Sequence, residues 1–438
     1  MLHGSLWDKV LLFALPLAAT GILQQLFNAA DVAVVGRFVG NHAMAAVGSN
    51  GPVIGLMVNL FVGISMGTNV VAAQFIGRND PDGVKRTVHT SILVALIGGI
   101  VLSIVGQLAV VPLLGFLDVP EEVFPMSQLY LRIYLTGLPF IFLYNFEAAI
   151  LRSHGDTRTP MVVLTISGLV NVVLNVFFVV VLGRSVDGVA IATVTSNVIS
   201  SGILFMILLR SDAMIRVRIS DFGIDPRVLG RILSIGVPSG LQGMVFSLAN
   251  LTVQSAINSL GPTVMAASSA AFNLEIFAFY VLNSYGQACT TFVGQNYGAG
   301  NIERCRRTLR VCILMNWASI AVTCSLILYF GRGLLGIFTT DPEVVKFGLI
   351  RLMYLFSAYP FSAVAEVLSG YFRGRGISLI PAVTTLVSVC GTRITWVYTV
   401  FPKSPTFPTL MIVYPISLGL SAVILGLIYL WRRVKFQW

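Results

Sequence analysis

Asp31 places a carboxylate where an apolar residue would be expected. It lies within the strongly apolar stretch LFNAADVAVVGR, and a carboxylate at the centre of a membrane span costs roughly 2.5–3.5 kcal/mol on insertion scales, which makes it a functional candidate. Two later apolar stretches carry Asn171 and Asn175, which would share one helix face, and Thr193. Carboxylate, amide and hydroxyl oxygens are ligands of hard cations such as Na⁺, and a carboxylate removed from water also binds a proton readily. We therefore predict that these four residues form a site for Na⁺ or H⁺, with a structural hydrogen-bond network as the alternative.

A second group of polar residues could line a substrate cavity. Gln24 and Asn28 are spaced to share a helix face with Asp31. Glu275 has three aromatic residues close behind it in the sequence, and an acid among aromatic side chains suits a cationic amphipathic ligand. The alternative for these residues is hydrogen bonding and packing between helices. The predicted cavity residues are Gln24, Asn28, Asn250, Gln254, Asn258, Glu275, Tyr280 and Asn283.

The remaining charged residues within apolar stretches are expected to be structural. Glu147 and Glu366 lie five and seven residues before Arg152 and Arg373, and we expect each acid to pair with the following arginine. Arg393 lies deeper in its stretch and could neutralise either Glu366 or the acid of the predicted cavity. The five cysteines are scattered and form no CxxC pair, so they are expected to be small packing residues.

The elements that carry these residues are predicted to be transmembrane helices. Of the 438 residues, 56% are hydrophobic and only 11% are charged, whereas soluble domains have about a quarter charged residues. The apolar stretches are long and continuous rather than alternating, which favours helices over a β-barrel. Twelve spans are predicted, over residues 9–36, 44–76, 88–116, 124–150, 159–182, 188–209, 228–259, 264–296, 308–330, 344–372, 378–401 and 408–431.

The distribution of basic residues predicts the orientation of the chain. Segments on one side of the predicted membrane carry 20 Lys and Arg residues, and segments on the other side carry 5. The positive-inside rule makes the first side cytoplasmic, with both termini, in an inner membrane. The net charge of +10 is therefore attributed to topology and not to a nucleic-acid partner. The first apolar stretch is long and lacks a small-residue cleavage site, so no cleaved signal peptide is expected.

The sequence repeats itself at a spacing of 221 residues. QFIGRNDPDGVKRT at 74–87 aligns with QNYGAGNIERCRRT at 295–308, and LLGFLDVPEEV at 113–123 aligns with LLGIFTTDPEV at 334–344. The chain is therefore predicted to hold two homologous six-helix lobes. Because six is even, both lobes start on the same side, and a pseudo-two-fold axis along the membrane normal relates them.

The predicted lobes are residues 1–209 and 228–438, joined by a polar cytoplasmic linker at 210–227. The repeat is not maintained at the predicted cation site. Asp31 aligns with Thr252 or Val253, and the two asparagines align with Thr392 and Trp396. This break in the repeat is what a cation site in one lobe would produce, and ordinary divergence of the two copies would also produce it.

Two repeated lobes favour a secondary transporter that works by alternating access, with its substrate held between them. The sequence has no Walker A motif and no HExxH. We therefore expect a transporter and not an enzyme.

Several motifs together resemble the multidrug and toxic compound extrusion (MATE) transporters. They are NAADVAVVGRFVG in the first span, AAILRSHGDTRTP after the fourth, NVVLN in the fifth, FVGQNYGAGNIERCRR after the eighth and SGYFRGRGISLIP after the tenth. The resemblance covers essentially the whole chain. It implies an all-α membrane protein with a V-shaped pair of six-helix lobes, which exports organic cations or other amphipathic compounds against inward Na⁺ or H⁺.

The resemblance also implies roles for individual residues. The acid of span one, two polar residues of span five and a threonine of span six form the family's cation or proton site, which maps onto Asp31, Asn171, Asn175 and Thr193. Some members have an Asp where this chain has Asn175, so a two-acid proton relay is not expected. Either Na⁺ or H⁺ could be the coupling ion. No cofactor besides a possible Na⁺ is expected, and the protein is expected to be a monomer in the lipid bilayer.

Two other functions fit a membrane protein of this size. A lipid-linked oligosaccharide flippase of the same superfamily fold would need several Arg or Lys residues in its cavity, whereas only Arg393 is predicted deep within a span. A scaffold or channel would not need a polar site in one lobe only.

Overall fold

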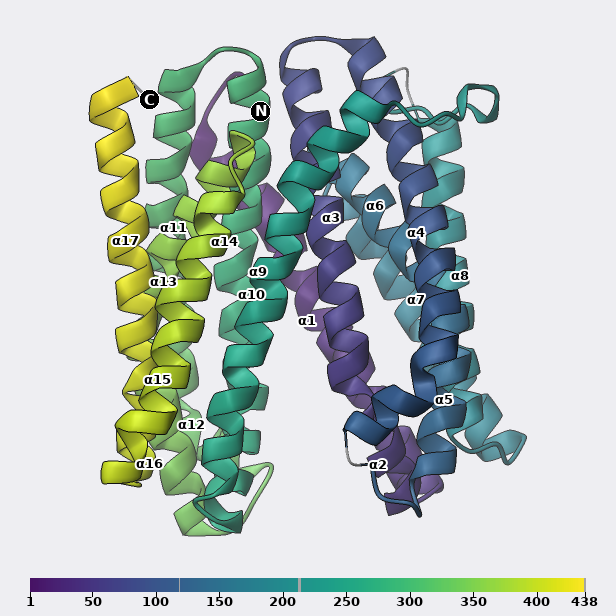
Figure 1. Cartoon of the computed structure of the whole chain (residues 1–438), viewed down its shortest axis with the longest axis vertical. Helices are drawn as coiled ribbons and strands as arrows, with labels where there is room; N and C mark the ends of the chain where they lie inside the picture. The colour runs from purple at the N-terminus through teal and green to yellow at the C-terminus, as the bar shows by residue number, and fades with distance from the viewer. Residues whose placement is uncertain (118, 212–213, 437–438) are drawn as a thin grey trace. The chain divides into compact units, whose positions relative to one another are not determined.

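The computed structural model describes residues 1–117, 119–211 and 214–436, and these ranges contain helices and no β-strand. Figure 1 shows the arrangement. The helices are α1 (Leu6–Phe38), α2 (Asn41–Ser49), α3 (Gly51–Gly77), α4 (Pro81–Phe116), α5 (Phe124–Thr136), α6 (Leu138–His154), α7 (Arg158–Val176), α8 (Val186–Arg210), α9 (Pro226–Asn258), α10 (Pro262–Gly298), α11 (Ile302–Tyr329), α12 (Gly331–Gly336), α13 (Pro342–Gly374), α14 (Leu379–Thr385), α15 (Thr392–Thr399), α16 (Phe407–Met411) and α17 (Val413–Phe436). Two π-helical turns, η1 (Phe177–Val181) and η3 (Leu386–Gly391), and two 3₁₀ turns, η2 (Ile219–Asp221) and η4 (Phe401–Lys403), complete the described elements.

The helices confirm the predicted membrane spans. In the described residues, eleven helical segments are long and apolar enough to cross a membrane. The remaining predicted span, 124–150, corresponds to the pair α5 and α6, which is bent by 47° at Gly137. Helices suit this environment because each one satisfies its own backbone hydrogen bonds where no water is present.

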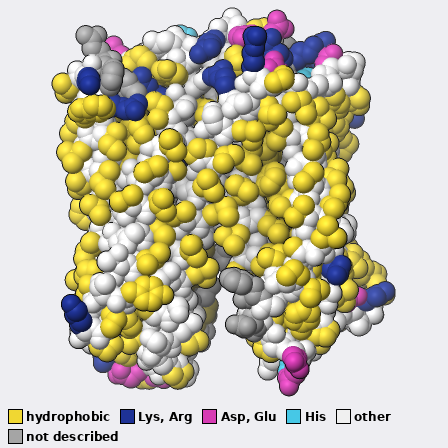
Figure 2. Space-filling model, viewed as in Figure 1, with side chains coloured by type: hydrophobic (Ala, Val, Ile, Leu, Met, Phe, Trp, Pro, Cys, Tyr) yellow, Lys and Arg dark blue, Asp and Glu magenta, His cyan; other side chains and the backbone are white. Residues whose placement is uncertain are grey.

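The outer surface of each unit is apolar, as lipid contact requires. Leu108, Val173 and Leu427 are each more than 60% exposed, although they lie within spans. Figure 2 shows hydrophobic side chains over the middle of the helices and most Lys and Arg side chains gathered at one helix end. The chain is therefore a multi-pass membrane protein.

The described chain forms two compact units. The N-terminal unit is Ala19–Gly236, and the C-terminal unit is Met1–Ala18 together with Val237–Trp438. Both α1 and α9 therefore pass from one unit to the other, next to Pro16 and Pro238 respectively. A proline inside a helix removes a backbone hydrogen bond and bends the helix, so these positions are natural points of division.

The unit limits differ from the predicted lobes because the start of each long helix packs away from its own repeat. Residues 1–18 belong to the C-terminal unit, where Leu6, Val10 and Phe13 join an apolar cluster with α10, α11 and α13. The ring of Phe13 meets that of Phe292 edge-on, with centroids 5.6 Å apart. The spacing of the repeat shows which segments are homologous, but it does not show which segments pack together.

The start of α9 belongs to the N-terminal unit because two glycines allow close backbone contact. A Cβ atom on Gly67 of α3 would lie 2.2 Å from the backbone oxygen of Ile232, and one on Gly236 would lie 2.5 Å from Cα of Ile64. Arg231, near this contact, also donates to Gln74 Oε1 at 2.6 Å. Small residues at a crossing point are a common means of helix association in membranes.

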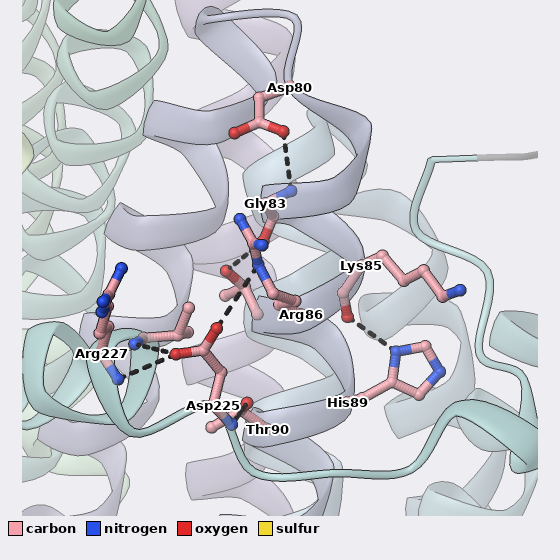
Figure 3. Close-up of polar contacts among 10 residues, drawn as sticks. Asp80, Gly83, Lys85, Arg86, His89, Thr90, Asp225 and Arg227 are labelled. Atoms are coloured by element: carbon pink, nitrogen blue, oxygen red, sulfur yellow. Dashed lines mark hydrogen bonds and ion pairs between the residues drawn. The ribbon is translucent and has the colours of Figure 1, made fainter.

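The polar linker packs against the start of α4 (Figure 3). Lys85 pairs with Asp221 at 2.8 Å, and Arg86 pairs with Asp225 at 3.5 Å. His89 accepts a hydrogen bond from the backbone N–H of Arg218 at Nε2, 3.0 Å away. These contacts hold the end of the predicted linker 210–227 on α4; Asp212 and Ala213 of that linker lie outside the described residues.

Candidate functional site

The four residues of the predicted cation site lie together in the N-terminal unit. Asp31 on α1 is 7% exposed. Its Oδ1 accepts a hydrogen bond from the Asn175 amide of α7 at 2.5 Å, and its Oδ2 accepts one from the Thr193 hydroxyl of α8 at 3.2 Å. The carboxylate is therefore held by neutral donors from two other helices.

The second asparagine closes the ring of contacts. Asn171 Oδ1 accepts from the Asn175 amide at 3.3 Å, and the Asn171 amide donates to Thr193 Oγ1 at 3.5 Å. One acceptor is left over, because Asn175 Oδ1 is buried and has no hydrogen-bond partner among the described residues. A buried polar atom without a partner is unfavourable, so it marks a place where a ligand can gain an interaction.

The close packing of α1 on α7 places these residues. Gly168 of α7 faces the ring of Phe27 on α1, and a Cβ atom on this glycine would lie 1.9 Å from the ring. Gly168 is one turn before Asn171, and Phe27 is one turn before Asp31, so this contact sets the approach of the two polar faces. The π-helical turn η1 begins directly after α7, and such turns are frequent at functional sites.

An apolar and aromatic layer surrounds the site. Tyr130 and Tyr134 of α5 lie within electrostatic range of Asp31, and their rings stack with centroids 6.1 Å apart. Tyr130 belongs to a buried cluster with Val35, Val179 and residues of α8. The spacing of four between the two tyrosines predicts a shared face, but the sequence alone does not show that this face meets Asp31.

The chemistry of the site suits a small cation of single charge. It offers one carboxylate together with amide and hydroxyl oxygens, which are hard ligands. One negative charge balances a proton or a monovalent cation, whereas a divalent ion would remain uncompensated in this buried setting. No group of three or more His, Cys, Asp or Glu residues suited to a metal occurs in the described part of the chain.

The predicted cavity residues of the first half lie apart from the buried carboxylate. Gln24 and Asn28 are exposed on α1, whereas Asp31 is buried. The shared face therefore begins at the surface of the N-terminal unit and ends at the carboxylate.

The predicted cavity residues of the second half fall into pairs and one cluster. Gln254 donates to Asn258 at 2.9 Å on α9, and Gln287 donates to Asn283 at 2.8 Å on α10. Tyr280 is partly buried on α10. These contacts follow each helix and do not by themselves define a cavity.

Glu275 is neutralised by Arg351, which the sequence did not pair with it. Its Oε2 accepts hydrogen bonds from Arg351 Nη2 at 3.0 Å and Nε at 3.2 Å. Arg393, which was predicted to neutralise Glu275 or Glu366, makes no direct ion pair with either acid in the described residues, although its charge acts on Glu275. Arg393 instead donates to Asn250 and Ser417.

The two predicted pairs near the cytoplasmic ends have different outcomes. Glu366 pairs with Arg373 at 3.1 Å, as predicted. The predicted pairing of Glu147 with Arg152 is wrong: neither carboxylate oxygen of Glu147 has a hydrogen-bond partner among the described residues, and Arg152 Nε donates to Ala148. Helix geometry explains the difference, since seven residues make almost two full turns but five residues point about 140° away.

The comparisons with known proteins agree with the repeat and with the fold. The MatE family model matches residues 16–177 and again residues 238–399. A probable multidrug resistance protein of Bacillus subtilis, YoeA, is 28% identical over 402 residues, which cover 89% of this chain and 86% of that protein. The probable multidrug resistance protein NorM of Thermotoga maritima is 27% identical, with 88% and 84% covered. A crystal structure of a MATE protein in complex with MaL6 has a TM-score of 0.92 and 23% identity, with 100% of this chain and 97% of that chain covered.

The two family matches begin 222 residues apart (238 − 16), close to the spacing read from the sequence, so the same module occurs twice. Together they cover more than half of the chain. With twelve spans and this internal repeat, the chain belongs to the MATE family of membrane transporters.

Proposed function

We propose that this protein is a secondary active multidrug exporter that antiports organic cations or other amphipathic compounds against inward Na⁺ or H⁺. Asp31, Asn171, Asn175 and Thr193 form the coupling site. The observation that carries the proposal is a single buried carboxylate held only by neutral donors in the described structure. The relatives with multidrug-resistance names support this class of cargo, and they do not favour a flippase.

The contacts suggest how ion binding could drive a movement. When Asp31 is ionised, its charge strengthens the hydrogen bonds from Asn175 of α7 and Thr193 of α8. A bound proton or Na⁺ removes that charge and competes for the same oxygens, so the ties from α1 to α7 and α8 weaken. The π-helical turn η1 next to Asn175 gives α7 a point at which to change its course. In this way, occupancy by the ion is linked to the position of α1, as alternating access requires.

From the distribution of basic residues we also propose that the protein lies in an inner membrane with both termini in the cytoplasm. It works there as a monomer. The gathering of Lys and Arg at one helix end in Figure 2 supports this orientation.

Transport in proteoliposomes tests the proposal. Vesicles that contain the purified protein are loaded with rhodamine 6G, a fluorescent cation, and a Na⁺ gradient and a pH gradient are imposed in separate experiments. The wild type should move the dye with at least one gradient, and Asp31→Asn should move it no faster than vesicles without protein. Glu122→Gln removes an exposed loop carboxylate and is the matched control. Driven transport at the wild-type rate by Asp31→Asn would refute the coupling role.

A further inference from the structure

A second buried polar cluster lies in the C-terminal unit. Arg351 of α13 holds Glu275 of α10 with two hydrogen bonds, at 3.0 and 3.2 Å, and its Nη1 donates to Ser268 at 2.7 Å. The arginine is 4% exposed. Each of the three guanidinium nitrogens of Arg351 therefore donates a hydrogen bond, and the charge of this arginine is balanced by one carboxylate.

Arg393 of α15 belongs to the same cluster but has no carboxylate of its own. It is fully buried, at 0% exposure. Its Nε donates to Ser417 at 3.2 Å and its Nη1 donates to Asn250 at 2.5 Å. Its Nη2 is buried and has no hydrogen-bond partner among the described residues. The guanidinium also lies over the rings of Tyr414 and Phe246, at 4.5 and 5.2 Å.

The cluster carries one positive charge in excess. Glu275 and Arg351 both act electrostatically on Arg393, so the field of one carboxylate is shared by two guanidinium groups. The hydrogen-bond partners of Arg393 are an amide and a hydroxyl, which are neutral. A buried guanidinium without a counter-charge is unfavourable within a membrane, and such residues usually mark a ligand pathway or a counter-ion site.

Part of this cluster lies on the spans of the second repeat that correspond to the spans of the cation site in the first repeat. The first, fifth and sixth spans of each repeat supply the central residues: α1, α7 and α8 in the N-terminal unit, and α9, α15 and α17 in the C-terminal unit. At the spacing of 221, Ser417 aligns with Ser196, and Arg393 aligns with the position after Asn171. In both repeats a π-helical turn lies beside the fifth-span residues.

We propose that the cluster of Asn250, Glu275, Arg351, Arg393 and Ser417 is a binding site for a singly charged anionic group, such as a carboxylate, with Arg393 Nη2 as its principal donor. A guanidinium presents a planar fork that suits such an acceptor. Asn250 and Phe246, which both contact Arg393, are only partly buried. The inference deepens the proposed export function, because the cargo then includes amphipathic compounds with an anionic group. The anion could instead be free chloride, and the experiment separates these two sources.

Equilibrium binding to the purified full-length protein in detergent tests the site without any ion gradient. The probes are rhodamine 6G, which is an ethyl ester, and its free acid, which differs by one carboxylate; fluorescence anisotropy gives both dissociation constants. Arg393→Gln should weaken the free acid by about tenfold or more and change the ester by less than about twofold. Glu275→Gln releases Arg351 and should tighten binding of the free acid. Arg332→Gln removes an exposed arginine and is the control.

The outcomes decide between the sources and can overturn the site. If the wild type binds the free acid more tightly in sulfate than in chloride at matched ionic strength, and Arg393→Gln abolishes this difference, the free acid and chloride compete for the site. If chloride raises the melting temperature of the wild type but not that of Arg393→Gln, and the two dyes have equal dissociation constants, the ligand is the inorganic anion. Equal losses for both dyes with Arg393→Gln, or no gain with Glu275→Gln, would overturn the proposal. Binding here does not depend on coupling through Asp31, so failure of the anion site and failure of ion-driven export are distinguished.

Discussion

Both repeats of this transporter bury polar groups on their first, fifth and sixth spans, but the charges of the two clusters are opposite. The second cluster also includes Glu275 of α10 and Arg351 of α13. In the N-terminal unit a lone carboxylate, Asp31, is surrounded by amides and a hydroxyl. In the C-terminal unit, Glu275 pairs with Arg351, and a second buried arginine, Arg393, has only neutral hydrogen-bond partners. Duplication supplied one framework, and substitution at a few positions gave each copy a different electrostatic character. The comparison shows that a shared fold does not fix the chemistry of a site.

The two clusters should also differ in how much they contribute to stability, and the largest effect is expected for the ion pair. Arg351→Leu leaves Glu275 buried without its partner, and breaking a buried pair in this way costs about 3–5 kcal/mol. We expect a large fall in the melting temperature of the protein in detergent. The double variant Arg351→Leu with Glu275→Leu should recover most of that loss, because no unpaired charge remains. If the double variant is no more stable than the single one, the ion pair is not the cause.

An intermediate effect is expected in the first cluster. Asn175→Ala removes one neutral donor to Asp31, and a hydrogen bond to a charged group contributes about 1.5–3 kcal/mol. Ion-driven export should weaken strongly, while the dissociation constants of both rhodamine dyes change little. Asn273→Ala, which removes an exposed amide that donates to Ser269 of the same helix, is the control. A stability loss as large as that of Arg351→Leu would erase the distinction between the two clusters.

The smallest effect is expected outside both clusters, at the linker. The hydrogen bond and the charge of Lys85 hold the pKa of Asp221 below its ordinary value of 3.8. A lowered pKa in the folded state means that the pair is intact above the ordinary pKa and is lost as the pH falls through the lowered one. At neutral pH, Asp221→Asn should therefore leave transport within about twofold of the wild type, since exposed pairs contribute little. It should speed proteolysis of the linker at low salt only; a similar increase at high salt would show that charge is not responsible.

Much of the fold followed from local patterns. Each of the twelve spans is a continuous apolar stretch, and the confirmed pairing of Glu366 with Arg373 follows from their spacing on one helix. A spacing of five residues places Glu147 and Arg152 on different faces of α6, so the prediction that they pair was wrong. The residues of the first cluster were identified because polar groups are conspicuous in apolar helices, although their distances and their shared burial were not.

Contacts between helices that are far apart in the sequence could not be predicted from local sequence patterns. The pairing of Arg351 with Glu275, and the position of Tyr130 and Tyr134 near Asp31, depend on which helix faces meet. Likewise, Gly168 appears as an ordinary small residue in the sequence, and only the structure shows the Phe27 ring filling the space beside it.

The sequence by itself determined that the chain contains two homologous sets of apolar helices, with a carboxylate in the first set. Hydropathy, charge and repeat spacing are properties of the linear chain. Only the tertiary structure decided which polar groups are partners, which arginine is left with a free donor and which helix segments pack in which unit. The physical reason is that hydrogen bonds and close packing act over a few ångströms, and those distances are set by helix crossings that no local pattern encodes.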